Sequence, residues 1–129
     1  MGLKPIAIFC YRNIVLLIFL NATIADHRTS AVDNQIAAGF WWKGIIPILP
    51  DDVLGVGVAR THVNSLVAYG DTLAGKEAPD AEYAMEVYFS LHPFEWVEMR
   101  PNFQLVKNPG GIRSANDVGI IGLKAAATL

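Results

Sequence analysis

The sequence predicts an all-β fold, an antiparallel transmembrane β-barrel segment of about five strands that forms a partial barrel, preceded by a hydrophobic, helical N-terminal segment. Two long stretches in the second half of the chain alternate apolar and polar residues, which places apolar side chains on one face of a strand. Charges gather on the other face and aromatic residues stand near strand ends, as in membrane barrels. Of the 129 residues 53% are hydrophobic, which is high for a soluble domain of this size.

Composition excludes two classes of protein. Charged residues make up 17% of the chain and the formal net charge is -2. A disordered chain is poor in apolar residues, and a nucleic-acid binder needs an excess of basic ones. We therefore expect one folded domain with no nucleic-acid partner.

Residues 1–25 form a hydrophobic segment that is signal-like or anomalous. Met1 to Lys4 gives a positive start, Ile6 to Leu20 is apolar, and Thr23 to Ala25 offers small residues for cleavage. A transmembrane helix needs about 20 apolar residues, and a central charge such as Arg12 costs about 2.5–3.5 kcal/mol. A signal peptide, an anchor and an accidental start all stay open for this segment.

Two strands are expected in the first half of the remaining chain, residues 26–129. Residues 52–64 are rich in Val and Gly, and their two faces are not distinguished. Residues 33–46 alternate, with an apolar face of Ile36, Ala38, Phe40 and Trp42 and a second face of Asp33, Gln35, Trp41 and Lys43.

A hairpin is expected from residues 82–91 and 97–105, joined by a turn over His92 to Glu95. The odd positions of both runs are mostly apolar, whereas Glu82, Glu86, Glu98 and Arg100 lie at even positions. Residues 117–129 form the last strand, and loops are expected at 47–51, 65–80 and 108–111. A soluble β-sandwich would show the same alternation and stays open as an alternative.

Several ordered motifs resemble the OprB-type carbohydrate-selective porins. They are Gly39-Phe40-Trp41-Trp42-Lys43-Gly44-Ile45-Ile46-Pro47, then Pro50 to Ala59, then Glu82 to Ser90 with Pro93 to Trp96, then Arg100 to Gly111 with its Asn-Pro-Gly-Gly loop. The resemblance covers about Asp26 to Leu129. It implies the C-terminal part of an outer-membrane barrel of about sixteen strands through which sugars diffuse.

The chain departs from this family in three respects. Leu49 stands where members carry an arginine, and Leu129 replaces a terminal aromatic residue. The N-terminal two thirds of the family has no counterpart here. Five strands are fewer than the eight of the smallest single-chain barrels, and open edges are costly in hydrocarbon. We therefore expect a truncated or fragmentary member.

Polar side chains on the second face of the strands are the candidate functional residues, because charges, aromatic rings and hydrogen-bonding groups line a sugar pore. The pore-lining candidates are Trp41, Lys43, Glu82, Glu86, Glu98, Arg100, Asn102 and Gln104. Solvated polar residues with mutual ion pairs are the plainer interpretation of each. Among the candidates, Glu98 and Arg100 are favoured for a constriction.

No catalytic, cofactor or metal site is expected. Asp51 and Asp52 are interpreted as turn residues, since adjacent strand positions point to opposite faces. The glycines at 55 and 57 lack the third glycine and the lysine of a nucleotide loop, and His27, His62 and His92 are scattered. The single cysteine, Cys10, forms no internal disulfide.

The function expected from the resemblance is passive carbohydrate transport across the bacterial outer membrane by a non-enzymatic porin. Its partners would be the lipid bilayer, sugar solutes, and other barrel strands or subunits. The alternative is an exported soluble β-sheet binding module without transport activity.

Overall fold

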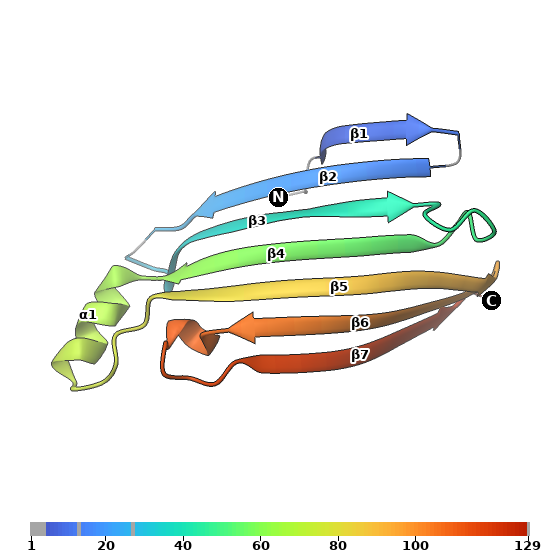
Figure 1. Cartoon of the computed structure of the whole chain (residues 1–129). Coiled ribbons are helices and arrows are strands. Elements are labelled where there is room, and N and C mark those ends of the chain that lie inside the picture. Colours follow the sequence, from blue (N-terminus) through green and yellow to red (C-terminus); the bar gives the residue numbers. More distant parts are fainter. Residues whose placement is uncertain (1–4, 13, 27, 129) are drawn as a thin grey trace.

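The computed structural model describes residues 5–12, 14–26 and 28–128. These residues form one antiparallel sheet of seven strands in which each strand pairs with the next along the chain (Figure 1). The strands are β1 (Pro5–Tyr11), β2 (Ile14–Ile24), β3 (Val32–Lys43), β4 (Val53–Val63), β5 (Ala81–Phe94), β6 (Val97–Lys107) and β7 (Val118–Ala127). The described part of β1 and of β7 pairs on one side only, so the sheet has two open edges.

The two ends of the sheet differ in the length of their connections. One end, called the turn end, carries the β1–β2 and β5–β6 turns and the β3–β4 loop, on the right of Figure 1. The opposite end, called the loop end, carries the β2–β3 connection, helix α1 (Ser65–Leu73) and the short helix η1 (Pro109–Gly111).

The N-terminal segment is a hairpin of strands, and the expectation of a helix there is wrong. β1 pairs with β2 from Tyr11 opposite Ile14, and β2 pairs with β3 along its whole length. Arg12 follows β1 directly with a φ of 52°, so its charge lies at the turn instead of inside a membrane-crossing span. The start at Met1 to Lys4 and position 13 lie outside the described residues.

The strands expected further along the chain are confirmed, which makes seven in place of five. β5 runs on to Phe94, so the hairpin turn is Glu95 and Trp96 and not the four residues from His92. The expected loop 65–80 contains α1, whose first turn is capped by Asn64, because its Oδ1 accepts the N–H of Leu66 at 2.8 Å. Position 129, where the resemblance implies an aromatic residue, lies outside the described residues.

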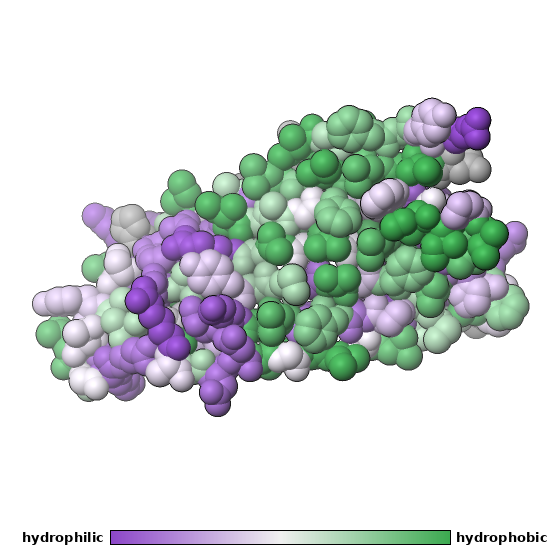
Figure 2. Space-filling model, viewed as in Figure 1, coloured by the Kyte–Doolittle hydropathy of each residue, from purple (hydrophilic) through white to green (hydrophobic). Residues whose placement is uncertain are grey.

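The described strands form a single layer, so the two-layered sandwich that the pattern left open is wrong. Val53 and Ala81 are the buried apolar side chains among the described residues, whereas Ile121 is 88% exposed. Figure 2 shows an apolar face over the strands, with hydrophilic residues gathered toward the loop end. No helix in the described ranges is long and apolar enough to span a bilayer.

Candidate functional site

Strand register gives the sheet a polar face, defined by the row in which Trp41 pairs with Gly55, Gly55 with Tyr88, Tyr88 with Asn102, and Asn102 with Gly122. Alternate residues of each strand share this face. The other positions form the apolar face. All eight candidate residues lie on the polar face: Trp41, Lys43, Glu82, Glu86, Glu98, Arg100, Asn102 and Gln104.

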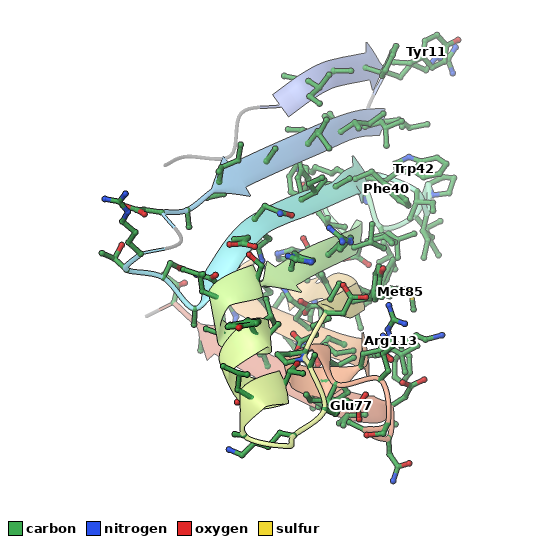
Figure 3. The ribbon with its side chains drawn as sticks, turned by 90° about the vertical axis from the view of Figure 1, so that its left-hand side faces the viewer. Tyr11, Phe40, Trp42, Glu77, Met85 and Arg113 are labelled. Atoms are coloured by element: carbon green, nitrogen blue, oxygen red, sulfur yellow. The ribbon has the colours of Figure 1, made fainter. Side chains whose placement is uncertain are left out.

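Burial is inverted relative to a soluble sheet. In β6 the apolar side chains of Met99, Phe103 and Leu105 are exposed, whereas Asn102 and Gln104 between them are half-buried. Phe40, Trp42 and Met85 point out from the same side of the sheet (Figure 3). In water this arrangement leaves apolar surface unburied, and hydrocarbon is the neighbour that it fits.

Glu98 and Arg100 form the densest polar cluster of this face. Arg100 donates to Glu98 Oε1 from Nη2 at 2.6 Å and from Nε at 3.2 Å. Ser90 on β5 donates its hydroxyl to the same oxygen at 2.5 Å. The Arg100 guanidinium also lies 4.7 Å from the centre of the Tyr88 ring. The two residues favoured for a constriction are thus held together and fixed to β5.

Further along the polar face, Asn102 donates to Glu86 Oε1 at 3.1 Å. Beside this pair, Trp41 and Tyr88 line a hollow of about 250 Å³ together with Phe19 of β2. The hollow therefore brings aromatic rings from three strands next to a carboxylate, with no chemistry beyond binding and positioning a solute.

The turn end of the polar face is held by ion pairs and by one buried carboxylate. Lys43 Nζ lies 2.9 Å from Asp51 Oδ1, and hydrogen bonding to this lysine holds the pKa of Asp51 below its usual range. Asp52, only 2% exposed, accepts the backbone N–H of His92 at 2.9 Å. Asp52 therefore ties the β3–β4 loop to β5, in place of the simple turn role expected from sequence.

Glu82 lies apart from the other candidates, at the loop end. Its Oε2 accepts the N–H of Gly110 at 2.7 Å, so it fastens the β6–β7 loop to β5. Nearby, Arg113 pairs with Asp80, and Ser114 donates to Glu77. These hydrogen bonds are the main cause that lowers the pKa of Asp80 and of Glu77. Glu77 and Arg113 are labelled in Figure 3.

Four further residues of the polar face are absent from the candidates named on the sequence. Tyr88 and Ser90 share even positions with Glu86, so parity alone would have found them. Lys124 lies directly opposite Arg100 in the strand register, and only the register shows that these two like charges are cross-strand neighbours. Phe19 was missed because its segment was not interpreted as a strand.

Glycines make room for the large side chains of this face. Gly39 pairs with Phe19, and a Cβ on Gly39 would lie 2.7 Å from the Phe19 ring. Gly55 pairs with Tyr88, whose ring would overlap a Cβ placed there. Each ring thus lies over a neighbouring strand, which requires glycine at these positions.

The sequence of the chain matches the model of the carbohydrate-selective porin family OprB over residues 12–129. The match covers nearly the whole chain and includes β2, which lies upstream of the stretch that carried the resemblance in the sequence. The chain belongs to the OprB family. Its known members are porins, which are channels and not enzymes.

Two known members of the OprB family are similar to the chain. Porin B of Pseudomonas aeruginosa is 33% identical over 122 residues, an alignment that covers 84% of this chain and 27% of that protein. The high-pH structure of Pseudomonas putida OprB superposes with a TM-score of 0.82 at 33% identity, over 89% of this chain and 30% of that chain. The chain spans less than a third of the length of either relative.

Proposed function

We propose that the chain forms part of the wall of a carbohydrate channel in the bacterial outer membrane, with its polar face toward the water-filled lumen. The observation that carries this proposal is the inverted burial of the one sheet, apolar outside and polar inside. The eight candidate residues then line the pore. Passage is by diffusion, because the polar face offers charges, amides and aromatic rings but no reacting group.

Connection lengths indicate how this wall lies in the membrane. Bacterial barrels have short periplasmic turns and longer extracellular loops. In the chain the turn end has the tight β1–β2 and β5–β6 turns, and the loop end has α1 and the β6–β7 loop. The loop end therefore faces the cell exterior and the turn end faces the periplasm.

The open edges of β1 and β7 call for further strands. An unpaired backbone group costs several kcal/mol in hydrocarbon, and each edge presents a row of them. Seven strands in sequence order place β1 and β7 parallel to each other. A closed antiparallel barrel therefore takes an odd number of additional strands, from other parts of a porin or from other subunits.

Thiol labelling in lipid vesicles tests the assignment of faces. Cys10 is first replaced by Ala, and single cysteines are then placed by Glu98→Cys and Gln104→Cys on the polar face and by Phe103→Cys and Leu105→Cys on the apolar face. A charged, water-soluble maleimide should label the first two variants at least about tenfold faster than the last two, because hydrocarbon excludes the reagent.

Equal labelling of both faces would contradict the proposal. A chain that stays soluble and monomeric by light scattering without detergent would also contradict it, since its apolar face would then have no lipid partner. The division into residues 1–25 and 26–129 remains a prediction, and sequencing the N-terminus of the mature chain decides whether β1 and β2 are retained.

A further inference from the structure

The apolar face carries two cations near the loop end. In the strand register Arg60 lies opposite Tyr83, and Tyr83 lies opposite Lys107. Tyr83 shares the face of Val87, four residues further along β5, because alternate residues of a strand point the same way. These three cross-strand neighbours, called here the basic row, lie where the apolar face gives way to the hydrophilic loop end in Figure 2.

The turn end of the same face is different. There Trp42 lies opposite Leu54, and Leu54 lies opposite Phe89. The next row pairs Leu91 with Met99, so both rows are apolar throughout. Aromatic rings alone serve a membrane boundary, since Trp and Tyr are enriched at both interfaces of a bilayer. Cations at one boundary only therefore indicate that the lipid headgroups at the loop end carry negative charge.

The spacing along β5 places the basic row at the level of lipid headgroups. Tyr83 and Phe94 lie on the apolar face at opposite ends of this strand. They are about 36 Å apart along the strand, which at a tilt of about 40° is about 28 Å of height. The apolar band of bacterial barrels is about 25 Å tall. With Phe94 at one boundary of the membrane, the basic row consequently lies at the other.

The two cations of the basic row form no ion pair with a carboxylate of the described residues. Arg60 donates to Oδ1 of Asn34 at 3.4 Å, and Lys107 is exposed without a side-chain partner in that part of the chain. Asp80 lies within electrostatic reach of Arg60, but its carboxylate is paired with Arg113. Both cations can therefore receive an anion from outside the chain.

The apolar surface beside the basic row fits the acyl chains of the same ligand. Val58, Met85 and Leu105 form the next row toward the turn end, and Val58 is 50% exposed. The two cations stand two strand spacings apart, about 10 Å, so their long side chains can reach one phosphate over the Tyr83 ring. An anionic headgroup with acyl chains satisfies both rows, whereas free phosphate satisfies only the basic one.

We propose that the basic row is a binding site for one anionic, phosphate-bearing lipid in the leaflet at the loop end. The phosphate lies between Arg60 and Lys107, and an acyl chain lies along Val58 and its row. The bound lipid then links β4, β5 and β6 from outside the channel wall. The site rests on the proposed channel function, since it requires the apolar face to lie in hydrocarbon.

Native mass spectrometry of the full chain in detergent micelles tests the site by counting bound lipids. Anionic phosphatidylglycerol should bind at least about tenfold more tightly than zwitterionic phosphatidylcholine. Arg60→Gln and Lys107→Gln should each weaken phosphatidylglycerol binding about fivefold, the contribution of one cation near an anionic lipid. An excess of inorganic phosphate should leave the lipid bound, because it offers nothing to the apolar row.

Lys124→Gln is the matched control, because it removes the same charge from the polar face. Lys107→Arg keeps the charge and should keep the binding. Lys107 has no side-chain partner within the described ranges, so its variants keep the test decisive if Arg60→Gln disturbs the fold.

Three results would overturn the lipid site. They are equal loss in the Lys107→Gln and Lys124→Gln variants, equal binding of the two lipids by the unmodified chain, and displacement of the lipid by inorganic phosphate. Thiol labelling that separates the two faces would leave the channel proposal standing in each case, so the two proposals fail separately.

Discussion

The two faces of the sheet are made from the same strands, yet their side chains differ in opposite ways from those of a soluble sheet: the apolar ones are exposed and several polar ones are buried or linked. On the apolar face, large side chains such as Ile121 and Leu123 are exposed, at 88% and 62%. On the polar face, Ser90 is buried and Glu98 and Arg100 are linked to each other and to β5. The interactions made within the described residues thus hold the polar face, whereas the apolar face depends on its surroundings.

This contrast teaches where the stability of the wall originates. A soluble sheet gains stability by burying its apolar face against a second layer. Here the single layer has no such partner among the described residues, and in the proposed channel wall lipid takes that place. Side-chain packing and hydrogen bonding on the polar face then specify the register of the strands. A substitution on the apolar face should consequently change stability through its contact with lipid, and one on the polar face through side-chain packing and hydrogen bonding.

The largest effect is expected from a charge on the apolar face. Phe103→Lys, near the middle of β6, should lower the free energy of unfolding in lipid vesicles by about 2–4 kcal/mol, the cost of Lys near the bilayer midplane. Phe103 lies between Val87 and Ile121, so the charge would have no polar neighbour on its own face. Urea titration followed by tryptophan fluorescence measures the change.

Gln104→Lys is the matched control, one residue further on the polar face. It lies directly opposite Glu86, and a cross-strand pair of opposite charges contributes about 0.2–1 kcal/mol. The control should be as stable as the unmodified chain or slightly more so. Similar destabilisation by both lysines would remove the contrast between the faces.

A smaller effect is expected where the polar face is tightly packed. Gly39→Ala places a methyl group against the Phe19 ring and the backbone oxygen of Val56, and overpacking of this kind costs about 1–3 kcal/mol. Gly57→Ala, on the strand partner of Gly39, meets only the Phe19 ring at 4.0 Å and should change stability by less than about 0.5 kcal/mol. The same urea titration compares them, and equal effects would show that the ring does not require glycine.

The contrast between faces also explains which strands could be predicted from the sequence. β6 alternates cleanly because each exposed apolar residue is followed by a polar one that faces inward. β2 carries Val15, Leu17 and Phe19 on its polar face, so both faces are apolar there. Alternation therefore gives no signal in this strand. In the sequence Arg12 interrupts one apolar run, whereas in the structure it follows β1 directly, at the turn to β2.

For the candidate site, the alternation of side chains along a strand is enough to predict which face each residue lies on. It does not predict the residues of other strands to which each side chain bonds. The side chains of Glu98 and Arg100 share a face by alternation alone. Their link to Ser90 depends on register, which is set by the two-residue turn of Glu95 and Trp96 together with the register shift between Leu91 and Phe94. The role of Asp52 was out of reach for the same reason, since its partner His92 is 40 residues away.

At the loop end, outside the membrane in the proposed arrangement, neither face contacts lipid. There we expect ion pairs and hydrogen bonds to hold the β6–β7 loop in place. Asp80 and Glu77 have pKa values below their usual range, mainly through hydrogen bonds from Arg113 and Ser114. A carboxyl group with a lowered pKa in the folded state stabilises it above the unfolded pKa, about 4, and this contribution is lost as pH falls through the folded value. The β6–β7 loop should therefore loosen below about pH 4.

Limited pepsin digestion between pH 5 and pH 2 measures this smallest effect, with the rate normalised to that of an unstructured peptide. Cleavage in residues 108–117 should rise as the pH falls, while β4 and β5 stay intact because lipid and strand pairing, not these carboxyl groups, hold them. Arg113→Gln should raise cleavage already at pH 5 and flatten the pH dependence, since the Asp80 carboxylate loses its donor. A flat profile for the unmodified chain would show that the exposed ion pairs contribute nothing to holding the loop, in line with the low value of many surface pairs.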